Sequence, residues 1–148
     1  MTNIIKLIKY EEGWRSKPYM CSENYPTVGF GFKIGTKDAD INQFKFTLPE
    51  NVGEVWLTTY LDDLVNELAQ NGLNLLTCSS RDAVLISMAY QMGVGGLLKF
   101  KMCLTAYRAG DWDEAAKQMT NSRWARQTPK RANRHAEQMK TGVWCDLY

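Results

Sequence analysis

The sequence changes its pattern within residues 10–31, YEEGWRSKPYMCSENYPTVGFG. Before this segment, apolar residues recur at helical spacing, which predicts a helix over residues 3–12 with Asn3 as its N-cap and Gly13 at its end. Residues 17–34 consist of short alternating segments separated by turn residues, which predicts an antiparallel sheet of two or three strands. The N-terminal part of the chain is therefore predicted to be one helix followed by a small sheet.

A long helix is predicted to follow the sheet, from about residue 50 to residue 70. Residues 83–92 are apolar on nearly every side, which indicates a buried central helix capped by Ser79 or Ser80. The glycine-rich segment 93–96 is predicted to break that helix. The long helix has one predicted apolar stripe, made up of Val52, Val55, Trp56, Tyr60, Leu61, Leu64, Val65 and Leu68.

Helix signals continue toward the C-terminus. Asp111 followed by Glu114 is typical of a capping box. Thr128 followed by Pro129 is predicted to be the N-cap and first residue of a last helix, which ends at Gly142. Helices therefore account for most of the second half of the chain.

Together these elements predict one mainly helical α+β domain over residues 1–148. We expect a sheet lobe at about residues 13–50, a linking helix at about 50–70, and a helical lobe at about 71–148 that includes the N-terminal helix. A chain of this length can bury roughly two-thirds of its unfolded surface. Its hydrophobic content of 45% argues against disorder.

The cysteines indicate free thiols and no metal site. They form no Cys-x-x-Cys pair, and the single histidine, His135, is not near any of them in the sequence. Because a domain of this size needs no covalent staple, we expect reduced thiols in a reducing cytosol and no cofactor. The four residues are Cys21, Cys78, Cys103 and Cys145.

The first residues do not resemble a secretory signal, because Lys6 and Lys9 interrupt the apolar run. No segment approaches the roughly 20 apolar residues of a membrane span, so we expect a soluble protein made in the cytosol, without stable membrane insertion. The net charge is +2, but residues 99–140 carry ten basic and four acidic side chains, a local charge of +6. Such a region is either a solvated helix surface or a surface for a polyanion, such as a cell wall, anionic lipid or nucleic acid. No nucleic-acid motif accompanies it, so we expect no nucleic-acid partner.

Glu12, Cys21 and Thr27 have a spacing that suggests a catalytic site. One acid at a helix end, facing two small polar side chains on a hairpin, is suited to protonate a leaving group and to direct a water molecule. The pattern Glu-x8-Cys-x5-Thr, followed by the Gly29-x-Gly31 pair, resembles the phage-type lysozymes, the muramidases of the T-even phage family. That family has Asp or, in some members, Cys at the middle position.

The resemblance extends in the same order from about Ile4 to Trp144 and is weakest between Gly35 and Leu76. It implies a lysozyme-like fold and a glycoside hydrolase without a cofactor. The matching blocks are Arg81-Asp82-Ala83-Val84, Ala89-Tyr90-Gln91-Met92-Gly93, Trp112-Asp113-Glu114-Ala115-Ala116, Ser122-Arg123-Trp124, Gln127-Thr128-Pro129-Lys130-Arg131-Ala132 and Thr141-Gly142-Val143-Trp144.

In this interpretation Glu12 is the acid, and it needs partly apolar surroundings to keep its proton near neutral pH. Cys21 departs from a two-carboxylate site. As a thiolate it could stabilise a cationic centre or act as a nucleophile, and as a neutral thiol it helps to hold the water. Thr27 is expected to bind the attacking water opposite Glu12, which implies inversion, whereas a covalent intermediate on Cys21 implies retention. The resemblance also places Arg131 beside Glu12 as a positioning residue.

For substrate binding, the resemblance assigns family positions to Lys33, Tyr90, Cys103 and Gln118. Lys33 and Cys103 differ from the residues expected there, so their backbone atoms are expected to matter more than their side chains. Tyr90 and the adjacent Gln91 could stack on and hydrogen-bond to a sugar.

The sequence is therefore interpreted as an endolysin-like muramidase, a monomer that hydrolyses the bond between N-acetylmuramic acid and N-acetylglucosamine in bacterial peptidoglycan and lyses the host. The resemblance implies that it accumulates in the host cytoplasm until a holin permeabilises the membrane. Three alternatives stay open: a catalytically weak or inactive peptidoglycan-binding protein, a membrane-active basic protein and a lytic transglycosylase.

Overall fold

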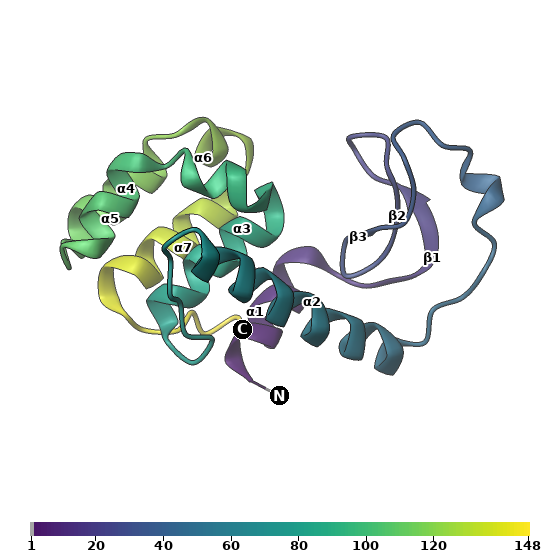
Figure 1. Cartoon of the computed structure of the whole chain (residues 1–148), viewed down its shortest axis with the longest axis horizontal. Coiled ribbons are helices and arrows are strands. Elements are labelled where there is room, and N and C mark those ends of the chain that lie inside the picture. The colour runs from purple at the N-terminus through teal and green to yellow at the C-terminus, as the bar shows by residue number, and fades with distance from the viewer. Residues whose placement is uncertain (1) are drawn as a thin grey trace.

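The computed structural model describes residues 2–148 and has a small sheet and a cluster of helices, joined by one long helix (Figure 1). The N-terminal half consists of α1 (Asn3–Glu12), β1 (Arg15–Met20), β2 (Pro26–Gly29), β3 (Phe32–Lys33), the one-turn 3-10 helix η1 (Ile41–Gln43) and α2 (Glu50–Gln70). The C-terminal half consists of α3 (Ser80–Leu98), α4 (Lys101–Arg108), α5 (Trp112–Thr120), α6 (Arg123–Gln127) and α7 (Pro129–Thr141). The predicted α+β class is confirmed.

The three strands form an antiparallel sheet in the order β1-β2-β3. Tyr19 pairs with Thr27 across β1 and β2, and Thr27 pairs with Lys33 across β2 and β3. The turn between β1 and β2 contains Asn24 in the left-handed region, with a φ of 64°, which asparagine tolerates better than most residues. This hairpin sets Cys21 just past the end of β1 and Thr27 in the central strand.

Helix α1 ends where the sequence predicts, because Gly13 has a φ of 69° and its N–H bonds to the Lys9 carbonyl. The predicted N-cap is wrong, since Asn3 is the first helical residue and Thr2 precedes it with extended backbone. Ile4, Leu7 and Ile8 face the core, which leaves the last turn of α1 at the boundary between the sheet and the helices (Figure 1).

The predicted apolar stripe of α2 is partly wrong. Its N-terminal aromatic and β-branched members are exposed, and Trp56 instead stacks on Phe32 with ring centroids 4.4 Å apart. Gly53 lies on the buried face because the Trp14 ring packs against it, so closely that a Cβ would lie 2.4 Å from a ring carbon. The observed buried face consists of Gly53, Leu57, Leu61, Leu64 and Leu68, whereas Val52, Val55, Trp56 and Tyr60 are exposed.

Helix α3 is the buried centre of the helical cluster, as predicted. The Ser79 hydroxyl accepts a hydrogen bond from the Asp82 N–H, every residue from Ala83 to Ala89 is fully buried, and Gly93 kinks the helix with a φ of 79°. Within residues 2–148, no single helix is long and apolar enough to cross a membrane. Taken together, α3 and α4 would be long and apolar enough, but they bend by 101° where they meet.

Three helix-capping residues were predicted for α5 and α7, and two of them, Asp111 and Gly142, have the predicted role. Asp111 accepts a hydrogen bond from the Glu114 N–H at the start of α5, and Gly142 ends α7 in the left-handed conformation. Thr128 does precede α7, but its hydroxyl donates to the Trp124 carbonyl of α6, so its expected role as a side-chain cap is wrong.

Candidate active site

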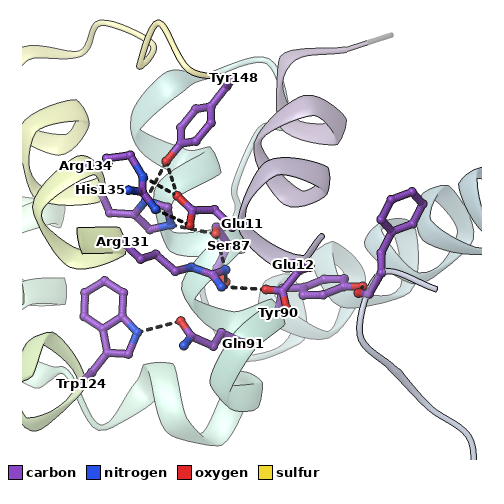
Figure 2. Close-up of polar contacts among 11 residues, drawn as sticks. Glu11, Glu12, Ser87, Tyr90, Gln91, Trp124, Arg131, Arg134, His135 and Tyr148 are labelled. Carbon is purple, nitrogen blue, oxygen red and sulfur yellow. Dashed lines mark hydrogen bonds and ion pairs between the residues drawn. The ribbon is translucent and has the colours of Figure 1, made fainter. Parts of the chain in front are cut away.

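Glu12 lies in the last turn of α1, where the helical cluster meets the sheet (Figure 2). Its side chain is 18% exposed, and its Oε1 accepts a hydrogen bond of 2.7 Å from Nη1 of Arg131 on α7. Its Oε2 lies next to Gly31, where a Cβ would be only 3.2 Å away. At Gly31 the sheet backbone therefore comes close to the Glu12 carboxyl group.

Arg131 is 8% exposed and is held from the other side by Ser87 of α3. Its Nη2 donates to both the Ser87 hydroxyl, at 2.9 Å, and the Ser87 carbonyl, at 3.2 Å. Among residues 2–148, Nη1 of Arg131 supplies the only hydrogen bond to the Glu12 carboxyl group, and Nε of Arg131 has no hydrogen-bond partner. The predicted proximity of Arg131 to Glu12 is confirmed, and we call this arrangement the single-contact pair.

The neighbouring acid, Glu11, is bound differently. Arg134 donates to both of its oxygens, from Nε at 2.9 Å and from Nη2 at 2.7 Å, and the Tyr148 hydroxyl donates to Oε1 at 2.7 Å (Figure 2). Burial alone would raise the pKa of Glu11, but the hydrogen bonds from Arg134 and Tyr148 outweigh it and lower the pKa below its ordinary value. Glu11 is therefore an ionised structural anchor.

Cys21 is half-buried at the start of the hairpin turn, and the Tyr25 N–H lies 3.4 Å from its sulfur. Burial would raise the pKa of this thiol, but backbone N–H groups of Tyr25 and Glu23 and the Thr27 hydroxyl lower it below the ordinary value. The hairpin thus favours the thiolate more than water would.

Thr27 is buried in β2, and its hydroxyl donates to the Tyr25 carbonyl at 2.8 Å. Since a hydroxyl has one hydrogen and two lone pairs, Thr27 bound in this way can still accept a hydrogen bond from water.

Two of the predicted binding residues, Tyr90 and Gln91, are on α3 and lie close to Glu12 of α1. The Tyr90 hydroxyl donates to the Phe30 carbonyl at 2.7 Å, so this side chain ties α3 to the sheet, and burial raises its pKa well above the ordinary range. Gln91 is exposed, and its Oε1 accepts a hydrogen bond of 2.8 Å from Trp124. Gln91 lines a cleft of about 490 Å³ together with Glu12 and Arg131 (Figure 2).

The other three predicted binding residues lie elsewhere. Cys103 is buried, which raises the pKa of its thiol to about 11, and it lines a second cavity of about 350 Å³ together with Gln118. Gln118 donates to Glu114 one helical turn earlier. Lys33 is exposed on β3, where its ammonium group lies 4.1 Å from the centre of the Tyr25 ring.

Sequence reasoning missed the residues behind Glu12 and Arg131. Ser87 and His135 are fully buried and contact each other, and Tyr148 joins His135 to Glu11. The one available signal was Ser87 within the otherwise apolar run 83–89, since the buried face of α7 contains Arg131 and Gln138 as well as His135. Within residues 2–148 no group of three or more His, Cys, Asp or Glu side chains is placed to hold a metal ion.

An acid at the junction of a small sheet and a helical cluster, next to a cleft, defines a lysozyme-like protein. The profile of the phage lysozyme family matches residues 9–138, and the chain belongs to this family. It is 31% identical to "Probable T4-type lysozyme 1" and 30% identical to "Probable T4-type lysozyme 2", both of Dictyostelium discoideum, over 97% of this chain and 96% of each relative. It is also 32% identical to the "Pre-baseplate central spike protein Gp5" of Enterobacteria phage T4, over 95% of this chain and 28% of that protein. Family and relatives support a glycoside hydrolase.

Proposed function

We propose that this protein is an endolysin-like muramidase that hydrolyses the bond between N-acetylmuramic acid and N-acetylglucosamine in bacterial peptidoglycan. The proposal rests mainly on the burial of the Glu12 side chain and on the contacts of its two carboxyl oxygens. Its side chain is mostly withdrawn from water, one oxygen has a single arginine contact, and the other faces Gly31 at the edge of the sheet. A carboxyl group in such surroundings is suited to carry a proton to the departing sugar oxygen.

In the proposed reaction Oε2 of Glu12 gives its proton to the glycosidic oxygen as the bond from that oxygen to the anomeric carbon breaks. A water on the opposite face donates one hydrogen bond to the Thr27 hydroxyl and one to the Cys21 thiolate, so that its free lone pair attacks the anomeric carbon. As the new carbon–oxygen bond forms, Cys21 takes the proton of the water. The lowered pKa of Cys21 supports the thiolate form that this step needs. Solvent then returns Glu12 and Cys21 to their starting states, and the product is inverted.

A covalent route is the alternative for Cys21. Its thiolate would then attack the anomeric carbon directly, and water would later release the sugar with retention. The anomer first formed, observed by NMR during cleavage of a soluble peptidoglycan fragment, separates the two routes. Replacement of Cys21 by aspartate tests them further, because a second carboxylate should support the water route.

Clearing of a peptidoglycan suspension tests the proposed function. The purified protein should clear the suspension, and Glu12→Gln should reduce the rate by about 10²- to 10⁴-fold, the usual contribution of a positioned acid. Glu67→Gln, which changes an exposed glutamate of α2, is the matched control and should leave the rate unchanged. Wall binding without clearing by the unsubstituted protein would instead indicate a non-catalytic peptidoglycan-binding protein.

Product analysis separates hydrolysis from the transglycosylase alternative. Hydrolysis leaves a reducing N-acetylmuramic acid end, whereas a lytic transglycosylase leaves an anhydro-sugar. The proposal predicts reducing ends alone. Leakage of anionic liposomes that survives Glu12→Gln would support the membrane-active alternative.

We further propose that the protein acts as a monomer, accumulates in the host cytoplasm and reaches the wall after a holin opens the membrane. The basic residues of the segment 99–140 support attraction to an acidic wall. Fractionation of cells before and after holin expression tests this sequence of events, and protein found outside the membrane without a holin would contradict it.

A further inference from the structure

A chain of buried hydrogen bonds connects the arginine of Glu12 to Glu11 (Figure 2). Ser87 Oγ lies 2.9 Å from Arg131 Nη2 and 2.8 Å from His135 Nε2. His135 Nδ1 lies 3.3 Å from the Tyr148 hydroxyl, which in turn lies 2.7 Å from Glu11 Oε1. Ser87 and His135 are both fully buried, so the contacts that join Arg131, Ser87 and His135 are shielded from water, whereas the two contacts of Tyr148 are partly buried.

The direction of every hydrogen bond in this chain follows from its two ends. The Glu11 carboxylate can only accept hydrogen bonds, so the Tyr148 hydroxyl donates its one hydrogen to Glu11. Tyr148 therefore accepts from His135 Nδ1–H, which leaves Nε2 of a neutral imidazole without a hydrogen. The Ser87 hydroxyl must then donate to that nitrogen, and its lone pairs accept from Arg131.

The surroundings of His135 keep it neutral. Burial first, and the positive charge of Arg131 second, lower the pKa of His135 to about 3. Of the other charged groups that act on it, Glu11 raises the pKa and Arg134 lowers it. At the pH of a living cell, His135 is therefore a hydrogen-bond acceptor toward Ser87.

Ser87 fixes the plane of the Arg131 guanidinium group. The two hydrogens of Nη2 are both used, one by the Ser87 hydroxyl and one by the Ser87 carbonyl. Because the guanidinium group is planar, a fixed Nη2 also fixes the direction of Nη1, which reaches only Oε1 of Glu12. Arg134, without such a restraint, grips both oxygens of Glu11.

We propose that Ser87 and His135 are positioning residues that hold Arg131 in the single-contact pair and thereby leave the second oxygen of Glu12 free to carry the transferable proton. This inference rests on the proposed role of Glu12 as the acid. Without the Ser87 hydroxyl, Nη2 has one acceptor fewer, and the guanidinium group can turn to bind both Glu12 oxygens. A two-contact pair favours the carboxylate and removes the proton donor at neutral pH.

Ser87→Ala tests the proposal through the pH dependence of the hydrolysis rate kcat. We expect the alkaline limb of the profile to move to lower pH. The rate on that limb should then fall about tenfold, while the rate at acid pH and KM stay near those of the unsubstituted protein. Ser80→Ala is the matched control, because Ser80 lies on the same helix and bonds to the Gly142 carbonyl at 2.6 Å.

Two variants of His135 sharpen the test. His135→Gln keeps a neutral acceptor for the Ser87 hydroxyl and should leave the alkaline limb close to its original position. His135→Leu removes the acceptor and should shift the limb in the same direction as Ser87→Ala. A rate loss that is equal at every pH in Ser87→Ala would indicate a merely structural role and would overturn the proposal.

A second measurement does not depend on activity. In protein labelled with ¹⁵N in the arginine side chains, the Nη signals of Arg131 followed by NMR should change in Ser87→Ala, because the guanidinium group then turns toward both Glu12 oxygens, and should stay unchanged in Ser80→Ala. Unchanged Arg131 signals in Ser87→Ala overturn the positioning role even if no hydrolysis is observed. Failure of the unsubstituted protein to cleave peptidoglycan, with the change at Arg131 present, would instead reject the proposed function alone.

Discussion

Glu11 and Glu12 are neighbours in the same helical turn, and each is paired with an arginine of α7, yet the two pairs differ. Glu11 is 3% exposed and is gripped at both oxygens, whereas Glu12 is 18% exposed and has the single-contact pair. In the proposed function, two identical side chains have different tasks, and the orientation of their partner guanidinium groups distinguishes them. The geometry of the arginine, more than burial alone, separates an ionised anchor from a candidate acid.

Removal of the Glu11 charge is expected to have the largest effect on stability. Glu11→Gln offers Arg134 one good acceptor in place of two and leaves a half-buried guanidinium group without its counter-charge. We expect the free energy of unfolding to fall by about 3–5 kcal/mol, the usual result of breaking a buried ion pair from one side. Urea unfolding measures this change.

The comparison predicts that Glu12→Gln loses less stability than Glu11→Gln. Both variants leave an arginine without its counter-charge, but a glutamine at position 12 keeps one oxygen for the one hydrogen bond from Arg131 Nη1, whereas Glu11→Gln also loses one of the two hydrogen bonds from Arg134. If Glu11→Gln and Glu12→Gln lowered the free energy of unfolding equally, the number of hydrogen bonds from each arginine would not determine the stability of the two pairs.

Acid should destabilise the protein in two steps. Unfolded His135 takes up a proton near its ordinary pKa of 6.5, whereas in the folded protein the pKa is about 3, so stability falls as the pH is lowered between these values. The slope from this one group reaches about 1.4 kcal/mol per pH unit. Glu11 adds stability that is present above its unfolded pKa of 4.5 and is lost as the pH falls below it, because its folded pKa is lower.

Urea unfolding between pH 3.5 and pH 7 separates the two steps. His135→Gln should flatten the upper part of the profile, between pH 6.5 and pH 4.5, and keep the loss at lower pH. A free energy of unfolding that does not change between pH 6.5 and pH 5 in the unsubstituted protein would contradict a neutral, buried His135.

The smallest effect is expected from Tyr148→Phe. The variant removes one of three hydrogen bonds to Glu11 and the acceptor of the His135 Nδ1–H, but it leaves the Arg134 fork in place, so a loss of about 1–3 kcal/mol is expected. Thermal unfolding measures it. A loss as large as that of Glu11→Gln would mean that Tyr148, and not Arg134, is the main partner of Glu11.

Local signals in the sequence were sufficient for most of the fold. Gly13 and Gly142 end their helices as predicted, since each adopts a positive φ that other residues avoid, and α2 has the predicted bounds, between Pro49 and Asn71. The buried face of α2 could not be predicted in the same way. Gly53 belongs to that face only because Trp14, from another segment, fills the space beside it.

The site could be predicted only in part. The proximity of Glu12 and Arg131 followed from a family resemblance, because the two residues are 119 positions apart. Ser87 and His135 are 48 positions apart, and no local pattern indicates that a serine of α3 and a histidine of α7 will meet. Cys103 was expected near the substrate on the same resemblance, and the structure shows its side chain buried.

The release of reducing sugar ends from purified peptidoglycan by Glu12→Gln and by Glu11→Gln, each confirmed to be folded by circular dichroism, tests the central claim most directly. We predict that Glu12→Gln releases almost none at any pH, whereas Glu11→Gln, assayed below its unfolding temperature, keeps a substantial rate. Substantial release by Glu12→Gln would show that the proton for the leaving group comes from a different side chain.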